Sequence, residues 1–228
     1  MGSQHHGKAI VTLTLKGCSS IIFDCDGVIL QSNRLKSDAL GKVLVQYDPK
    51  IVAAFVAWHK KTGGVSRFEK FANFFRHQLG VEDWQALTDA ACVDFGKIVF
   101  ESLCRCPFVP GFAAYLAWLQ TQNIPLAVNT GGAEDEVRAV FRTRGMLGDF
   151  KTVLGSPTTK FDNMIKLREM DLLRPGAIYF GDSRLDFELA RDFELHFVYV
   201  GYESEWPEGK IVTSQTGGQI ISDYQSML

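Results

Sequence analysis

The sequence predicts an α/β fold in which a doubly wound parallel sheet carries an inserted, all-helical domain. Short apolar runs that end at or beside a polar residue recur along the chain, and helical stretches separate two of them. A long segment after the first run contains amphipathic helices but no convincing alternating strand. With 228 residues, of which 46% are hydrophobic, the chain can bury one sizeable core and a smaller insertion.

Three buried strands are expected at residues 21–24, 126–129 and 178–180, where the apolar runs lie. Helical stretches at residues 134–144 and 161–173 separate the last two runs, so strands and helices alternate as in a Rossmann-like sheet. Ligands of such sheets bind beyond the carboxyl ends of the strands. The residues that follow each run are therefore the candidates for function.

The segment after the first strand is expected to form the helical insertion. Apolar residues recur at helical spacing over residues 43–61 and 68–79, and a third helical region covers residues 82–103. A stretch that contains proline and glycine then returns the chain to the core. The predicted domains are a core of residues 9–31 and 108–228 and a helical domain of residues 32–107.

Composition and charge limit the classes of partner that the chain is expected to bind. The formal net charge is -2 with acids and bases scattered along the chain, so no basic stripe favours nucleic acid or an anionic membrane. The apolar runs are too short to span a bilayer, which leaves a small soluble ligand as the expected partner. Five cysteines without metal-ligand spacing fit a reducing, cytoplasmic location. Residues 1–8, which include His5 and His6, are as typical of a tag remnant as of a native start, and no functional argument uses them.

Asp24 and Asp26 follow the first strand directly, and their spacing places both side chains on the same side of the chain. One carboxylate can attack an electrophile while the other moves protons, provided that a cation offsets their repulsion. Gly27 allows the chain to turn sharply away. Asp and Gly also favour ordinary turns for backbone reasons, so this motif alone leaves both interpretations open.

Asp182 and Asp186 follow another strand where a helix is expected to start, and their spacing of four lets both side chains face one way if the helix has begun. Carboxylates at such positions suit a hard cation such as Mg²⁺. An N-cap of the helix by Asp182 or Ser183 is the alternative, and it is compatible with the first interpretation.

Thr130, Gly131 and Gly132 end the middle strand and open a helix. A hydroxyl and bare backbone N–H groups at a helix N-terminus make a phosphate site, although Thr-Gly-Gly can equally be an ordinary loop. Lys160 precedes a further helix. A single lysine is usually a solvated surface charge, so its assignment depends on the other motifs.

Taken together, these motifs resemble those of the haloacid dehalogenase superfamily. The resemblance covers the core before and after the insertion, and four motifs in the expected order are far more specific than any one alone. The motifs are Asp24 with Asp26, then Thr130, then Lys160, then Asp182 with Asp186.

The resemblance implies a role for each residue. Asp24 attacks phosphorus and forms an aspartyl phosphate, while Asp26 protonates the leaving oxygen and then activates water. Thr130 and the Gly131 amide hold phosphate oxygens, and Lys160 balances charge on the nucleophile and the phosphoryl group.

The resemblance also implies a cofactor. Mg²⁺ is bound by Asp24, the backbone carbonyl of Asp26 and Asp182, and Asp186 supports this ligand set. The implied function is a Mg²⁺-dependent phosphatase acting on a small phosphorylated metabolite, such as a sugar phosphate. The helical insertion has the position of the small cap that closes over the substrate in one branch of the superfamily. Nothing in the sequence specifies an oligomeric state.

Within the insertion, Gly63 to Arg67 resembles the cap loop of sugar-phosphate mutases, so Arg67 is a candidate to meet a second anion or sugar hydroxyls. Ser66 is equally a good N-cap for the helix that follows. Mutases of this type carry a histidine roughly where this chain has Lys36, and that departure weakens a mutase function.

Three other functions are weighed against the phosphatase. Halide-removing members lack an acid at the position of Asp26, which argues against dehalogenation. A β-phosphoglucomutase-like activity remains an alternative, and so does a binding or regulatory module with little turnover. The presence of every ionisable motif residue argues against the module.

Overall fold

The computed structural model describes residues 15–227, so the expectation for residues 1–8 lies outside it. Its centre is a six-stranded sheet in the order β3-β2-β1-β4-β5-β6, and every neighbouring pair is parallel. This order reverses beside β1, which is where such sheets bind ligands. The strands are β1 (Ile21–Phe23), β2 (Leu126–Ala133), β3 (Thr152–Ser156), β4 (Ile178–Gly181), β5 (His196–Val200) and β6 (Gln219–Ile221).

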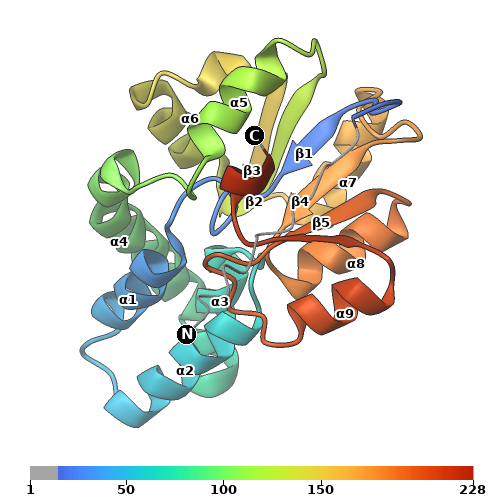
Figure 1. The fold of residues 1–228 in the computed structure, drawn as a ribbon. Coiled ribbons are helices and arrows are strands. Elements are labelled where there is room, and N and C mark those ends of the chain that lie inside the picture. Colours follow the sequence, from blue (N-terminus) through green and yellow to red (C-terminus); the bar gives the residue numbers. More distant parts are fainter. Residues whose placement is uncertain (1–14, 228) are drawn as a thin grey trace, which may run out of the picture.

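Helices cover both faces of the sheet, which confirms the predicted doubly wound α/β fold (Figure 1). Successive strand residues point to opposite faces, so Ile21 and Phe23 join one apolar cluster and Ile22 joins the other. α5 and α6 pack in the first cluster, and α7 and α8 pack in the second. The core helices are α5 (Phe112–Gln120), α6 (Glu134–Thr143), α7 (Lys160–Glu169), α8 (Arg184–Asp192) and α9 (Gly209–Gln215), with short 3₁₀ turns at Leu147–Asp149 and Tyr224–Met227.

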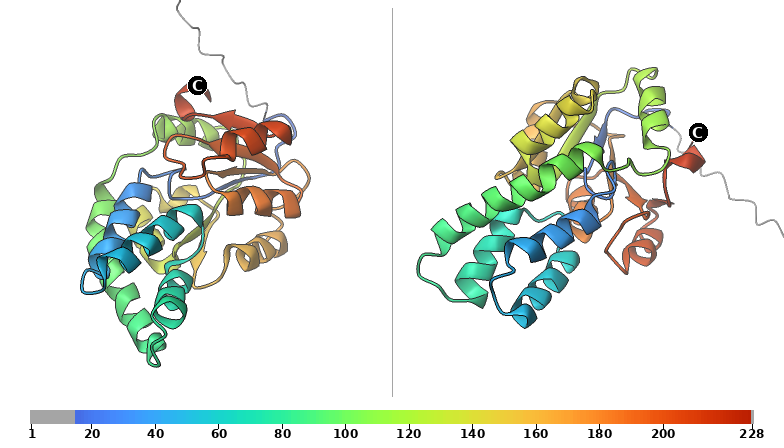
Figure 2. Two further views of the ribbon diagram at one scale, coloured as in Figure 1. Left: turned by 90° about the horizontal axis from the view of Figure 1, so that it is seen from below. Right: turned by 90° about the vertical axis from the view of Figure 1, so that its left-hand side faces the viewer.

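Between β1 and α5 the chain forms a group of helices that projects from the sheet, as Figures 1 and 2 show. Its interior is aromatic, because phenylalanine side chains from four elements pack on one another. The elements are α1 (Asn33–Val43), α2 (Pro49–Lys61), α3 (Arg67–Asn73), a π-helical turn η1 (Phe74–Gln78) and α4 (Trp84–Arg105).

Several predicted boundaries are wrong. The expected helix over residues 43–61 breaks after α1, because Asp48 accepts a hydrogen bond from the Lys50 N–H (2.7 Å) and Pro49 occupies the first position of α2. The sequence did not predict α1, β3, α9 or β6. β3 escaped detection because it is short and contains Gly155 and Ser156 in place of an apolar run. Within residues 15–227, no helix combines the length and the apolar character that crossing a bilayer requires.

Candidate active site

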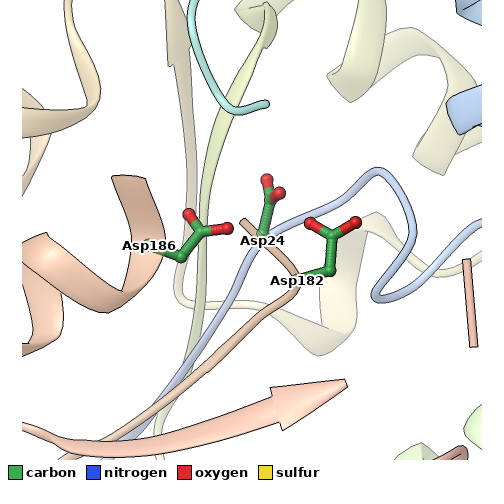
Figure 3. A group of neighbouring side chains, drawn as sticks. All are labelled: Asp24, Asp182 and Asp186. Atoms are coloured by element: carbon green, nitrogen blue, oxygen red, sulfur yellow. The ribbon is translucent and has the colours of Figure 1, made fainter. Parts of the chain in front are cut away.

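Three carboxylates from separate elements meet at the carboxyl end of the sheet. Asp24 follows β1, Asp182 follows β4, and Asp186 lies on the first turn of α8. β1 and β4 are neighbours in the sheet, and the Asp24 N–H donates to the Phe180 carbonyl at 2.9 Å. One oxygen from each carboxylate lies within 4.8 Å of the others, and Figure 3 shows Asp24 between the other two.

The electrostatics of this cluster suit a cation. The pKa of Asp24 is raised to about 7: burial is the largest cause, Lys160 lowers the pKa in opposition, and the carboxylates of Asp186 and Asp26 raise it. Burial, together with Asp24 and Asp186, also raises the pKa of Asp182 well above its usual range. Oxygen ligands crowded in this way fit a hard divalent cation such as Mg²⁺, which offsets their charge.

Lys160, the first residue of α7, contacts two members of the cluster. Its Nζ is 2.8 Å from Asp24 Oδ1 and 2.7 Å from Asp186 Oδ1, and the side chain is buried. Burial works against its charge, but Asp186 and Asp24 raise the pKa of Lys160 well above its usual range. Asn129, to which the sequence assigned no role, donates from Nδ2 to the Lys160 carbonyl at 3.0 Å and fixes the start of this helix.

Asp186 is fully engaged with protein groups. Its Oδ2 accepts from the Ser183 N–H (3.2 Å) and hydroxyl (2.7 Å), and its Oδ1 accepts from Lys160 and the Tyr179 hydroxyl (3.0 Å). Ser183 accepts in return from the Asp186 N–H, which completes a capping box. Ser183 therefore caps the helix, as one interpretation of the sequence predicted, and Asp186 still belongs to the acidic cluster. These bonds favour a supporting role for Asp186 beside a metal that other residues hold.

Asp26 lies on the loop after β1 and is held from the helical insertion. Lys36 Nζ donates to Asp26 Oδ2 at 2.6 Å, and the Ser32 hydroxyl donates to Oδ1 at 2.5 Å. Burial alone would raise the pKa of Asp26, but Lys36 and these hydrogen bonds lower it overall. The turn after Asp26 needs Gly27, whose φ is 73° and where a Cβ atom would collide with the Asp182 carboxylate.

Thr130, Gly131 and Gly132, the expected phosphate site, lie within the last part of β2. They do not open a helix as predicted, because β2 continues to Ala133 and α6 begins at Glu134. Thr130 is fully buried, and its hydroxyl oxygen accepts from the Gly132 N–H at 3.0 Å. Gly131 faces the loop of the insertion so closely that a Cβ atom at this position would collide with the Gly64 carbonyl. The insertion and the core are therefore in close contact at this point.

A cleft between the insertion and the core collects many of the predicted residues. Asp24, Asp26, Gly131 and Asp182 line its core side, and Arg67 lines it from the insertion. The other predicted residues lie behind this surface; they are Thr130, Lys160 and Asp186.

The comparison with known families decides the identity of this fold. Residues 21–200 match the model of the haloacid dehalogenase-like hydrolases. The chain belongs to this family. Its membership confirms the resemblance and the enzyme class, a haloacid dehalogenase-like hydrolase, that the motifs predict.

Solved structures agree with the family. The chain is similar to a predicted phosphoglycolate phosphatase from Haemophilus somnus (19% identity, TM-score 0.69, 91% of this chain and 95% of that one). It is also similar to CbbY from Rhodobacter sphaeroides in complex with phosphate (20%, 0.67, 91% and 95%) and to β-phosphoglucomutase from Clostridium difficile (14%, 0.68, 92% and 93%). At these identities the likeness establishes the fold. No curated protein matches the sequence significantly.

In this haloacid dehalogenase-like protein, the predicted substrate-binding residue Arg67 forms an ion pair with the core. Its guanidinium forms an ion pair of 2.9 Å with Glu136 on α6 and lies over the Phe95 ring at 5.1 Å. Ser66 caps α3 by accepting from the Glu69 N–H at 3.3 Å, which confirms the predicted N-cap. Contact between Arg67 and a substrate stays a prediction.

Sequence reasoning missed several residues that build the cleft. Asn33 donates from Nδ2 to Asp182 Oδ2 at 2.7 Å, and the Ser204 hydroxyl donates to the Asp182 carbonyl at 2.5 Å. Ser204 lies after β5, in a segment that shows no motif. Lys36 was noted only as a departure from the mutases, and Lys70 was not noted. Lys70 had a sequence signal, because it follows Arg67 by three residues and shares its helix face.

Proposed function

We propose that the chain is a Mg²⁺-dependent phosphatase that hydrolyses a small phosphate monoester through an aspartyl phosphate on Asp24. The observation that carries this proposal is the placement of Asp24 between the Lys160 ammonium and the Asp182 carboxylate, with Asp26 two residues away at the cleft. CbbY has been solved in complex with phosphate, and a mutant of the same protein has been solved with xylulose-1,5-bisphosphate. These complexes support a phosphorylated small molecule as the substrate. The five free cysteines support a location in a reducing cytosol.

In the proposed reaction, an Asp24 oxygen bonds to phosphorus as the bond from phosphorus to the alcohol oxygen breaks. Asp26 donates its proton to that oxygen, and the dianionic phosphate favours the protonated acid by raising its pKa. In the second half, Asp26 takes a proton from the water that attacks phosphorus, the bond from phosphorus to the Asp24 oxygen breaks, and inorganic phosphate and the free Asp24 carboxylate result. The Thr130 hydroxyl and the Gly131 amide hold phosphate oxygens, and Lys160 balances their charge.

Asp24, the Asp26 carbonyl and Asp182 are the residues that would hold Mg²⁺, with Asp186 beside them. When bound, the ion neutralises charge between the carboxylate nucleophile and the anionic phosphate. We further propose that residues 32–107 act as a cap over the cleft, because the loop at Gly64 meets the core at Gly131. Closure of such a cap excludes water from the reacting groups.

Phosphate release from a panel of small phosphate esters, with Mg²⁺ and with a chelator, tests the function. We expect release that depends on Mg²⁺ and that Asp24→Asn abolishes, while Asp38→Asn, which changes an exposed acid on α1, retains it. Asp26→Asn should slow turnover and accumulate a phosphorylated protein that mass spectrometry detects. Turnover at the wild-type rate by Asp24→Asn would refute the mechanism.

Two other outcomes would redirect the assignment. Transfer of phosphate between positions of a sugar without net release would indicate the mutase. Absence of both release and transfer would indicate a binding or regulatory module.

A further inference from the structure

The insertion side of the cleft carries only positive charge. Among the described residues that line the cleft, the insertion contributes five lysines and arginines and neither aspartate nor glutamate. The core side holds the acidic groups, which include Asp24, Asp26 and Asp182. The two walls are therefore of opposite sign, and the acidic wall is the one that would take a cation. The cationic residues of the insertion are Lys36, Lys60, Lys61, Arg67 and Lys70.

Most of these cations already have a counterion or water. Lys36 pairs with Asp26, Arg67 pairs with Glu136, and Lys60 lies 3.6 Å from Glu205. Lys61 is exposed, so water can solvate its ammonium. Their positive charges need no further partner.

Lys70 differs from all of them. Its side chain is only 2% exposed, and within residues 15–227 no carboxylate lies within ion-pair distance of its ammonium. The Nζ atom instead contacts His59, at 2.8 Å from Nδ1 and 3.4 Å from the carbonyl oxygen. Because Lys70 donates to Nδ1, the neutral His59 ring carries its proton on Nε2, which is then a second donor.

This arrangement is unfavourable without an anion. Burial, followed by the nearby Lys36 charge, lowers the pKa of Lys70 to about 7. Burial and the charges of Lys70 and Lys36 lower the pKa of His59 to about 3. A methionine or leucine would fill the same space without this cost, so packing alone does not account for a lysine here.

We propose that Lys70 and His59 bind a second anionic group of the substrate, a carboxylate or a phosphate, while the reacting phosphate lies at Asp24. The substrate is then a small phosphate ester with a second negative charge at its other end. The acidic wall repels this second group unless it lies under the insertion, so charge also fixes the direction in which the substrate binds. This inference rests on the proposed phosphatase function.

Pairs of esters that differ in one group test the proposal. 2-Phosphoglycolate and 2-hydroxyethyl phosphate differ in a carboxylate against a hydroxymethyl group, and propane-1,3-diol bisphosphate and its monophosphate differ in the second phosphate. We expect kcat/KM with Mg²⁺ to be about tenfold or more higher for the doubly anionic member of at least one pair, and the preferred pair identifies the anion. Lys70→Met should reduce this ratio to about one, whereas Lys42→Met, which removes an exposed lysine of α1, should retain it.

Binding separates this inference from the proposed function. Phosphonoacetate and methylphosphonate resist phosphate-ester hydrolysis, so calorimetry in Mg²⁺ measures their Kd whether or not the protein turns over esters. The carboxylate site is supported if the wild type binds phosphonoacetate more tightly than methylphosphonate and if Lys70→Met removes this difference. The same comparison of propane-1,3-diyl bisphosphonate with propylphosphonate tests the second phosphate. If the wild type shows no preference for a second anion in either assay, or if Lys70→Met retains the preference, the inference is overturned. Absence of a preference in the wild type overturns the inference even if Lys70→Met does not fold. If the protein hydrolyses no ester, the proposed phosphatase function is contradicted. The site for a second anion is then tested by the binding measurements alone.

Discussion

Arg67 of α3 and Glu136 of α6 form an ion pair of 2.9 Å that joins the helical insertion to the core. The two side chains are only 13% and 12% exposed, so water screens the pair less than it screens a surface salt bridge. The Arg67 guanidinium also lies over the Phe95 ring. The contact therefore contributes to holding the insertion against the core.

Glu136→Gln should weaken this contact. The charge of Arg67 then lacks its partner, so the closed arrangement becomes less populated and kcat/KM should fall about tenfold. Asp135→Asn is the matched control, because it changes the adjacent, exposed acid of the same helix. Steady-state kinetics of both variants measure the effect. Equal kcat/KM for Glu136→Gln and the wild type would show that the ion pair does not govern closure.

Lys36→Met should slow turnover about a hundredfold without changing the nucleophile. Lys36 positions the Asp26 carboxylate at 2.6 Å, and misplacing a proton-transfer group by about 1 Å can cost this much. Lys36→Arg should restore part of the rate, because it restores the charge. Single-turnover kinetics locate the loss in formation or in hydrolysis of the phosphoenzyme. A Lys36→Met enzyme with the wild-type rate would remove Lys36 from the mechanism.

Gly131→Ala should impair closure while preserving the backbone N–H that is proposed to hold phosphate. The added methyl group collides with the Gly64 carbonyl, so the insertion has to move away and KM should rise about tenfold. Gly41→Ala is the control, since a Cβ atom there meets nothing within 4 Å and alanine favours the helix. Kinetics and hydrogen exchange of the loop at Gly64 report the change. An unaffected KM would mean that catalysis does not need this close approach.

Mg²⁺ should stabilise the protein in thermal unfolding. At a concentration of about 100 times its Kd, a ligand of the native state adds about 2.7 kcal/mol to the free energy of unfolding. Asp182→Asn should abolish this increment, yet it should stabilise the metal-free protein because it removes a crowded, buried carboxylate. Potassium at matched ionic strength controls for screening. An Mg²⁺ increment that survives in Asp182→Asn would place the ion elsewhere.

Lys70→Met should stabilise the protein, and the effect should depend on pH. The pKa of Lys70 falls from 10.5 to about 7 on folding, so the unfolded chain binds more protons between these values and wild-type stability rises with pH across this window. Lys70→Met should therefore gain roughly 1–3 kcal/mol at pH 7 or below, and the gain should vanish towards pH 10.5. Urea unfolding at several pH values measures this difference, and a gain that does not change with pH would contradict it. The titratable or charged groups that face Lys70 are His59, Lys36, Asp26, Glu205 and Glu69.

Local sequence patterns were sufficient to predict the cluster of buried carboxylates at the end of the sheet. Asp24 and Asp182 each follow a buried strand, and parallel neighbouring strands bring their ends together, so the cluster follows from the topology. The capping box at Ser183 and the N-cap at Ser66 were visible for the same reason, since their partners lie three residues away.

Contacts between distant segments were not predictable in the same way. Lys36 reaches Asp26 only because α1 folds back over the loop after β1. Asn33 bonds to Asp182 although the two residues are 149 positions apart in the sequence. α1 itself was missed because its buried positions include Ser37 and Ala39, which give little apolar periodicity.

The phenylalanine-rich interior of the insertion is continuous with one face of the sheet. Phe71 and Phe95 belong to the same buried apolar cluster as Phe23 and Phe112. Hydrophobic stabilisation is thus shared between the two lobes, and neither can lose its packing without exposing part of the other. The protein should accordingly melt in one cooperative transition, and a fragment without residues 32–107 would expose an apolar surface that promotes aggregation.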